Sequence, residues 1–246
     1  MINDLGVTIE VVRSGLSYHT IRDWELTVTN NDYIGEPEQE TNYIDVPGRN
    51  GFIDASETVS GRRIFKSRVI RIELGGIRKR LTWDTVISTF RNKIHGETVH
   101  LTFDNDISHY WVGRCYIEDF DRARKVGTFV LTIPYAEPYK YNIEQSSEPW
   151  KWDPFSFVDG IALNLGDLVI NGQQSVTIPS GNMEVSPTFI VSRLSGVLTM
   201  TDGENTYALT SGSNRFPDLF VNGDPEVVLT FTGSATVSIV YRGGSL

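Results

Sequence analysis

The four histidines and the single cysteine are the residue types best suited to metal binding or nucleophilic catalysis. They are His19, His95, His100, His109 and Cys115. No two histidines have the spacing of a metal-binding helix motif, and no cysteine cluster supports them. A lone cysteine within an alternating strand pattern is typical of a small core residue, and one cysteine cannot form a disulfide within the chain. We therefore expect no metal site and a structural role for Cys115.

Two acidic segments contain oxygen atoms that could bind calcium, Asp104-Asn105-Asp106 and Asp202-Gly203-Glu204-Asn205. A complete calcium loop supplies five or six oxygen positions and ends in a bidentate glutamate, which neither segment offers. Asx-rich hairpin turns explain both segments better. The chain also has no Gly-x-Ser-x-Gly elbow, phosphate-binding glycine loop or dinucleotide fingerprint, and nothing marks a converging carboxylate pair. The sequence predicts a protein that is not an enzyme and uses no cofactor.

Basic residues are concentrated in one part of the chain. They are Arg62, Arg63, Lys66, Arg68, Arg71, Arg78, Lys79 and Arg80. A solvated strand face and turn is the simplest interpretation, and an interface with an acidic neighbour, including the next copy of the same protein, is the second. Direct nucleic-acid binding is the least favoured, because stacking aromatic residues do not interleave with these positions as a groove for a single strand would need.

The distribution of charge indicates two domains with different surroundings. Residues 1–140 contain 18 Lys and Arg against 20 Asp and Glu, whereas residues 141–246 contain 4 against 11. A length of 246 residues is enough for two modest domains with separate cores. We predict domains at 1–140 and 141–246, with a proline-rich linker at about 134–157. No apolar run is long enough to span a membrane, and no secretory signal peptide is expected.

The first domain is expected to be α+β, with more strand than helix. Trp24 to Thr29 and Arg62 to Leu74 alternate as strands do, and Gly75-Gly76 is expected to end the second strand. One amphipathic helix is predicted from the Thr82 cap to the stop at Gly96. Its apolar stripe consists of Trp83, Val86, Ile87, Phe90 and Ile94. Further strands are expected at 99–103, 110–117 and 126–133.

The second domain is expected to be all-β. Seven short β-rich runs between Leu168 and Tyr241 are separated by clusters of Gly, Asn and Asp, which is typical of a sandwich or jelly roll. Before it, the segment Trp150-Lys151-Trp152-Asp153-Pro154-Phe155-Ser156-Phe157 is the most aromatic part of the chain. Its rings could stack on a sugar or staple the linker to both domains, and two prolines that fix its path favour the staple.

A shaped turn lies in the segment Asp45 to Ser56. In Val46-Pro47-Gly48-Arg49, proline presets φ at the second turn position and glycine takes the positive φ required at the third. Gly51 allows a further bend without the cost of a Cβ.

This turn and its neighbours resemble the distal tail protein of long-tailed phages that infect Gram-positive bacteria. The matching residues, in order, are Trp24, Pro47, Gly48, Arg49, Gly51, Trp83, Gly113, Arg114, Pro134, Tyr135, Pro138 and Tyr139. The resemblance covers roughly residues 15–141. Beyond that, only the architecture matches. It implies a mainly β protein whose first domain is a β-sandwich with one helix and a β-hairpin, followed by a galectin-like sandwich.

The resemblance also implies a structural role in the virion. Six copies of a distal tail protein close into a ring that joins the tail tube to the tail-tip or tail-lysin protein, and in many phages the outer domains carry receptor-binding proteins for host adhesion. The chain is then made in the host cytoplasm and resides in the phage tail tip or baseplate, without membrane or nucleic-acid partners. A carbohydrate-binding adhesin acting through residues 141–246 is the alternative, and a cell-wall hydrolase is a third hypothesis that lacks catalytic residues.

A closed ring requires two different surface patches that meet between neighbouring copies. Strand edges are natural candidates because their backbone groups are unpaired. The length and charged face of the predicted strand Arg62 to Leu74 suggest that Arg68 and Arg71 contribute to the ring interface.

Overall fold

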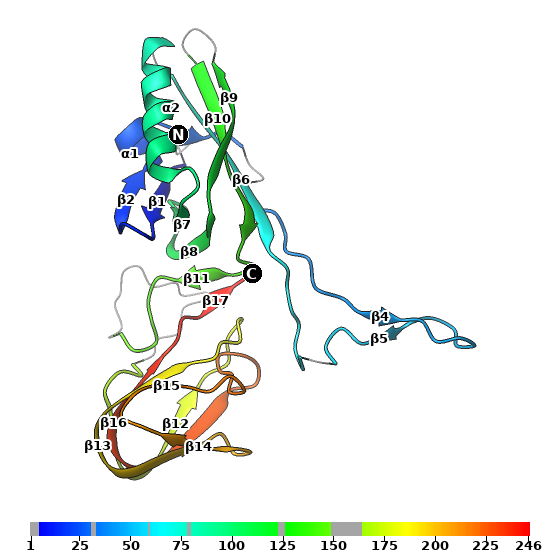
Figure 1. The fold of residues 1–246 in the computed structure, drawn as a ribbon, viewed down its shortest axis with the longest axis vertical. Helices are drawn as coiled ribbons and strands as arrows, with labels where there is room; N and C mark the ends of the chain where they lie inside the picture. Colours follow the sequence, from blue (N-terminus) through cyan, green and yellow to red (C-terminus); the bar gives the residue numbers. More distant parts are fainter. Residues whose placement is uncertain (1–4, 31–32, 59, 78–79, 123–125, 149–163) are drawn as a thin grey trace. The chain divides into compact units, whose positions relative to one another are not determined.

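The computed structural model describes residues 5–30, 33–58, 60–77, 80–122, 126–148 and 164–246. Contacts between Cα atoms divide the chain into unit 1, Met1–Pro138, and unit 2, Tyr139–Leu246. Figure 1 shows the elements of both units. Within the described residues, every helix is too short or too polar to traverse a lipid bilayer.

Unit 1 is built from two antiparallel sheets, each with four strands from this unit. The first has the order β8 (Asp106–Arg114), β7 (Thr98–Phe103), β1 (Val7–Val11) and β2 (Leu16–His19). The second has the order β3 (Thr27–Val28), β6 (Arg68–Ile77), β10 (Val126–Ala136) and β9 (Tyr116–Arg122). Two helices, α1 (Thr20–Trp24) and α2 (Arg80–Ile94), and a small hairpin of β4 (Tyr43–Ile44) and β5 (Ile53–Asp54) complete the unit.

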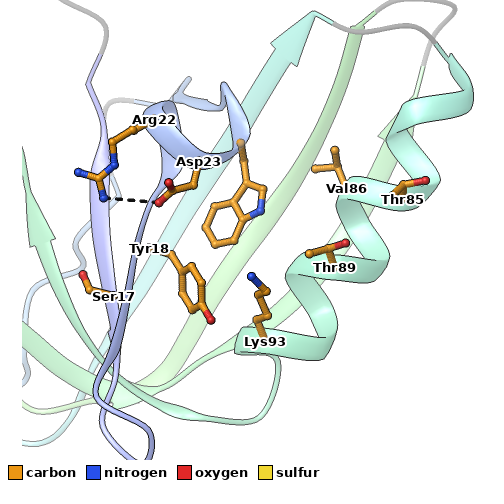
Figure 2. A pocket seen from close by; sticks show the side chains of 9 residues that line it. Ser17, Tyr18, Arg22, Asp23, Thr85, Val86, Thr89 and Lys93 are labelled. Atoms are coloured by element: carbon orange, nitrogen blue, oxygen red, sulfur yellow. Dashed lines mark ion pairs between the residues drawn. The ribbon is translucent and has the colours of Figure 1, made fainter.

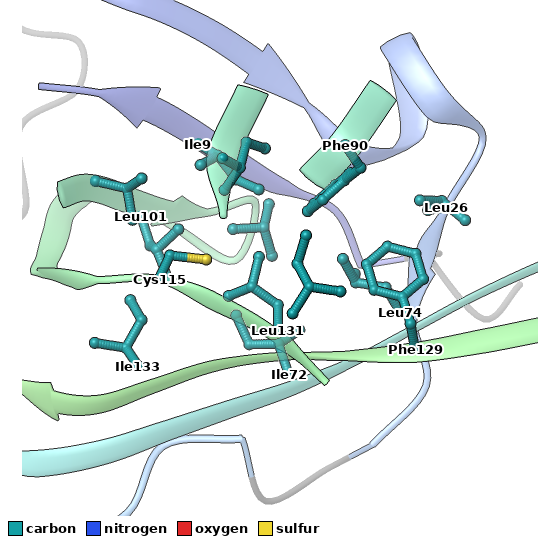
Figure 3. Close-up of a cluster of buried hydrophobic side chains, with 14 of the residues drawn as sticks. Ile9, Leu26, Ile72, Leu74, Phe90, Leu101, Cys115, Phe129, Leu131 and Ile133 are labelled. Atoms are coloured by element: carbon teal, nitrogen blue, oxygen red, sulfur yellow. The ribbon is translucent and has the colours of Figure 1, made fainter. Parts of the chain in front are cut away.

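The two sheets and α2 enclose one hydrophobic core (Figure 3). The inward residues of β1 and β7 follow strict alternation, so that Ile9 and Leu101 are fully buried. Phe90 of α2 lies against Trp24 at 4.6 Å and against Phe129 of β10 at 5.0 Å between ring centroids. The mainly β class and the sandwich-like organisation expected from the sequence are confirmed.

Helix α2 is the amphipathic helix that the sequence predicts. Trp83, Phe90 and Ile94 of its apolar stripe are fully buried. The helix begins at Arg80, two residues before the expected Thr82 cap. It ends as predicted, because Gly96 takes a positive φ of 81° that terminates the helical path.

A second helix, α1, lies where the sequence predicts a strand. Trp24 closes this helix instead of beginning the strand Trp24 to Thr29, and β3 covers only Thr27–Val28. The helix is held by reciprocal capping, since Nδ1 of His19 accepts the backbone N–H of Arg22 and the carboxylate of Asp23 accepts the N–H of His19. Trp24 and Leu26 are nevertheless buried, as expected, although the backbone conformation at Trp24 is helical.

The long strand β6 is shifted relative to its prediction. It spans Arg68–Ile77 instead of Arg62 to Leu74, and it continues through Gly75-Gly76. Both positions favour glycine, because a Cβ on Gly75 would lie 2.8 Å from Cγ2 of Thr29, and one on Gly76 would lie 2.9 Å from the carbonyl of Glu25. The predicted strand at 110–117 divides between β8 and β9, which lie in different sheets, with buried Cys115 at the corner between them.

Gly113 of β8 allows the two sheets to approach each other closely. A Cβ at this position would lie 2.2 Å from Cγ2 of Ile133 and 3.1 Å from Cα of Ala136, both on β10. We expect Gly113→Ala to lower the free energy of unfolding of unit 1 by about 1–3 kcal/mol, because the added methyl group overpacks the core. Urea unfolding measures the loss, and Val112→Ala on the opposite face serves as the control with a smaller effect. A Gly113→Ala protein as stable as the parent would contradict this packing.

Unit 2 is all-β, as predicted, but the short runs merge into longer strands. Its sheet has the order β12 (Leu168–Ile178), β16 (Val227–Val240), β13 (Thr188–Thr201) and β14 (Thr206–Leu209), with β15 (Gly212–Arg215) also paired to β13. The remaining strands, β11 (Lys140–Asn142) and β17 (Gly244–Ser245), pair with each other.

Bends inside these long strands explain why the sequence resolves them as separate runs. Gly172 in β12, Gly196 in β13 and Gly233 in β16 all take positive φ values, and the pairing of β13 with β16 shifts register between Ser192 and Thr199. The sheet can therefore curl around its own core, in which Phe189 and Phe231 are fully buried. Glycines that indicate turns in the sequence act here as bends within continuous strands.

Candidate assembly surface

A long two-stranded arm, defined here as residues 35–67, connects neighbouring strands of the second sheet of unit 1. Its two sides pair through the backbone, since the N–H of Lys66 donates to Glu38 and that of Glu40 to Ile64, each at 2.8 Å. At the base of the arm, the N–H of Gly35 donates to Val69 of β6, also at 2.8 Å. Farther along, β4 pairs with β5 through Tyr43↔Asp54 and Ile44↔Ile53 (Figure 1). The arm is therefore a regular extended hairpin along much of its length.

The turn that closes the arm is the one predicted from the sequence. The N–H of Arg49 donates to the carbonyl of Val46 at 3.1 Å, and Gly48 has a φ of 82°. Gly51 also has a positive φ, 77°, so the chain bends a second time before β5. Proline and glycine thus fix the shape of the end of the arm.

Apolar side chains around this turn are exposed to solvent. We call the group Tyr43, Ile44, Phe52 and Ile53 the arm tip. Tyr43 and Phe52 are 58% and 66% exposed, and their ring centroids lie 6.5 Å apart. A contiguous exposed cluster of large apolar side chains marks an interaction surface. Strand alternation places Tyr43 and Phe52 on one face of the hairpin and the paired Ile44 and Ile53 on the other, so the arm tip is a candidate surface that is apolar on both faces.

Arg68, at the base of the arm, is buried rather than exposed. It is 4% exposed, and its guanidinium carbon lies 4.5 Å from the centre of a Trp111 ring. Among the described residues, its Nε and Nη2 atoms have no hydrogen-bond partner. Burial lowers the pKa of Arg68, and the carboxylate of Glu36 partly offsets that effect. The Arg68 side chain therefore packs within the fold of unit 1 and is not presented on its surface.

Arg71 lies on the outward face of β6 among carboxylates. Its guanidinium is 2.6 Å from Oδ2 of Asp119 and 3.6 Å from Oε2 of Glu118. Thr132 also donates to Glu118, at 3.1 Å. Arg71 is about half exposed, so a partner molecule could reach its guanidinium by competing with these acidic neighbours.

Both edges of β6 are occupied by other parts of unit 1. One side of the strand pairs with β10, and the other is covered by β3, by Tyr33, whose carbonyl accepts the Arg71 N–H, and by a bridge between Ile34 and Ile70. β6 is therefore an interior strand, and its backbone edges are not open to a partner strand. A contribution of Arg68 and Arg71 to a ring interface stays a prediction, and it would have to come from their side chains.

The sheet ends instead at β9. This strand is acidic, with Glu118, Asp119 and Asp121, and its register with β10 shifts where Asp119 takes a positive φ of 48°. Charge and a bulge on an edge strand discourage unspecific pairing with other strands.

Three histidine–carboxylate pairs lie in or beside the first sheet of unit 1. They are His19–Asp104 at 3.0 Å, His100–Glu10 at 3.2 Å and His109–Asp106 at 2.7 Å. Ser108 also contacts His109, but through the same Nδ1 atom that contacts Asp106, so the three do not form a relay. Among the described residues, no three or more His, Cys, Asp and Glu side chains form a metal-binding group.

Cys115 is fully buried, and burial raises the pKa of its thiol. A thiol with a raised pKa is a poor nucleophile, so the expected structural role of Cys115 is confirmed.

The chain matches no protein-family model, and no curated protein matches it. Among solved structures it is similar to the crystal structure of SPP1 Dit (gp 19.1), described as a paradigm of the hub adsorption apparatus in phages that infect Gram-positive bacteria. The TM-score is 0.54, the sequence identity is 12%, and the match covers 96% of this chain and 98% of Dit. This chain has a Dit-like fold. The predicted resemblance to a distal tail protein is confirmed at the level of the fold.

The residues that carried the resemblance to distal tail proteins do not converge on one pocket. Trp24, Trp83 and Gly113 pack inside unit 1, whereas Pro47, Gly48, Arg49 and Gly51 shape the end of the arm. Arg114 donates to the carbonyl of Gly96 and links β8 to the end of α2. Pro134 and the 79% exposed Tyr135 lie at an irregularity in β10. Pro138 and Tyr139, both half-buried, are the last residue of unit 1 and the first residue of unit 2 along the chain.

Sequence reasoning missed the arm tip. A signal was available, because apolar residues flank a tight turn in a segment too short to belong to a larger sheet. The aromatic segment Trp150, Trp152, Phe155 and Phe157, which the staple and sugar-platform hypotheses concern, lies outside the described residues. The adhesin alternative therefore stays a prediction without a supporting observation.

Proposed function

We propose that this chain is a structural, non-enzymatic protein of a phage tail, which forms a hexameric ring at the distal end of the tail tube. In this role it connects the tube to the tail-tip or tail-lysin protein and supports the receptor-binding apparatus at the host surface. The observation that carries the proposal is the likeness of fold to SPP1 Dit, which extends over nearly the whole length of both chains.

The surface of unit 1 supports self-assembly. A ring built from identical copies requires one patch that docks on a different patch of the next copy. The arm tip supplies an apolar patch that the described arm does not bury, and its turn is rigid, so docking costs less conformational entropy than the docking of a flexible loop.

The first experiment is the solution mass of the purified protein by light scattering, with negative-stain images of the same peak. We expect ring-shaped particles with a mass near six times 27.6 kDa. Tyr43→Ser with Phe52→Ser is expected to weaken the hexamer, because each substitution removes apolar contact area from the arm tip. Val169→Ser, at a residue of unit 2 that is 69% exposed, is the matched control and should leave the mass unchanged.

Two results would contradict this assignment. A protein that remains monomeric at all concentrations would rule out autonomous ring formation. A hexamer that the arm-tip substitutions and the control affect equally would show that the ring forms through another surface.

A further inference from the structure

A pocket with a volume of about 510 Å³ lies between β2 and α2 of unit 1 (Figure 2). Ser17 and Tyr18 line it from β2, and Trp24 lines it from the end of α1. Thr85, Thr89 and Lys93 line it from α2, where their spacing of four residues places them in one row along the helix. The pocket is therefore a groove between an edge strand and a helix, distinct from the arm and from the Arg71 network.

The wall formed by β2 presents backbone groups without a strand partner. In β1, Val7 and Val11 turn their backbone groups toward the side of β2, because the Val7 N–H donates to Thr20 and the Val11 carbonyl accepts from Gly15. Ile9 has the same parity and lies opposite Tyr18, so Ser17 turns its N–H and carbonyl away from β1. β2 is the last strand of its sheet, so this side of Ser17 is open to another strand.

The charges in the groove favour a negatively charged occupant. The carboxylate of Asp23 is already used, since it accepts the His19 N–H at 2.7 Å and lies 3.5 Å from Arg22. The ammonium group of Lys93 lies 4.4 Å from the centre of the Tyr18 ring and forms no ion pair with a carboxylate of the described residues. The groove thus offers one cation that lies over an aromatic ring and whose charge no acid of the described residues balances.

We infer that this groove binds an extended acidic peptide segment of a partner protein, which adds a strand to β2 and places a carboxylate on Lys93. Strands in a sheet lie about 4.8 Å apart, so the side chains of an added strand lie above Tyr18 and beside the row from Thr85 to Lys93. Main-chain hydrogen bonds to Ser17 supply register, and Lys93 supplies preference for an acid, as in other strand-addition sites. This inference does not depend on ring formation.

The test uses a fluorescein-labelled peptide, acetyl-Thr-Val-Glu-Val-Thr-amide, whose β-branched residues favour an extended backbone. The control peptide has Lys in place of Glu. We expect saturable binding of the acidic peptide to the full-length protein in fluorescence anisotropy, and a loss of at least about tenfold in affinity for Lys93→Glu. The Lys93→Glu protein should instead prefer the lysine peptide.

Two variants separate the groove from general charge effects. Arg91→Glu makes the same charge change on an exposed residue of α2 that does not line the pocket, and it should leave the affinity unchanged. Ser17→Pro removes the outward N–H at an edge position that tolerates proline, and it should weaken binding of both peptides to the parent protein.

Three results would overturn the inference. The first is no saturable binding of the acidic peptide at concentrations up to about 1 mM, the weak end of measurable affinity. The second is an equal loss for Lys93→Glu and Arg91→Glu. The third is absent peptide binding together with a smaller solution mass for Lys93→Glu, which would show that a second copy of the chain occupies the groove.

Discussion

Replacing Phe90 by alanine is expected to lower the free energy of unfolding of unit 1 by about 3–5 kcal/mol and to leave unit 2 unchanged. Phe90 is fully buried and joins Trp24 of α1 to Phe129 of β10, so its removal leaves a cavity between the helix and the sheet. The corresponding change in unit 2 is Phe231→Ala, which removes a fully buried ring 6.3 Å from Phe189.

Hydrogen exchange resolved by peptide measures both units in one experiment. Phe90→Ala should accelerate exchange in unit 1 alone, and Phe231→Ala should do so in unit 2 alone, because each unit has its own core. The reciprocal variants are controls for each other. If either substitution destabilised both units by the same amount, the proposal of two independently stable domains would be refuted.

The second large effect is expected at Arg68. Arg68→Glu should cost unit 1 about 3–5 kcal/mol, since it loses the contact with Trp111 and places a carboxylate in a buried site near Glu36. Arg71→Glu, three residues along the same strand, should cost only about 1 kcal/mol because Arg71 is half exposed to water. Thermal unfolding of the two variants side by side measures the difference.

A third substitution separates charge from volume at this site. Arg68→Met retains much of the side-chain volume and removes two buried donors that lack partners within the described part of the chain, so it should remain within about 1 kcal/mol of the parent. Equal stability of Arg68→Glu and Arg71→Glu would show that Arg68 is not buried in solution. The effect of β6 on ring formation is then best tested with Arg71→Glu, because that variant should remain folded.

The sequence was most informative where local chemistry decides the backbone. Pro47 and Gly48 fix the backbone dihedral angles of the turn at the end of the arm, and this turn forms as predicted. The apolar stripe of α2 and the stop at Gly96 likewise define the helix to within two residues. The α1 helix was missed because its cap is a histidine, His19, whose preference for that position is weak. Its geometry depends on Asp23 and on the buried position of Trp24.

The candidate surfaces were harder to predict because they depend on contacts distant in sequence. Arg68 has the same parity as the buried Ile70, Ile72 and Leu74, but only the approach of Trp111 from another strand makes an inward arginine acceptable. The groove likewise combines β2 with α2, which are far apart along the chain. No local pattern in either segment indicates that they form opposite walls.

The position of the arm in the sheet has a consequence for the divergence of related proteins. The arm begins after β3 and returns into β6, and these two strands are hydrogen-bonded neighbours. The arm can therefore become longer or shorter, or be replaced, without a change in the order of the strands. The entropy cost of closing a longer loop grows only slowly with its length. If the arm docks on a neighbouring copy as proposed, the fit of that contact can therefore change without altering the residues that pack the core of unit 1.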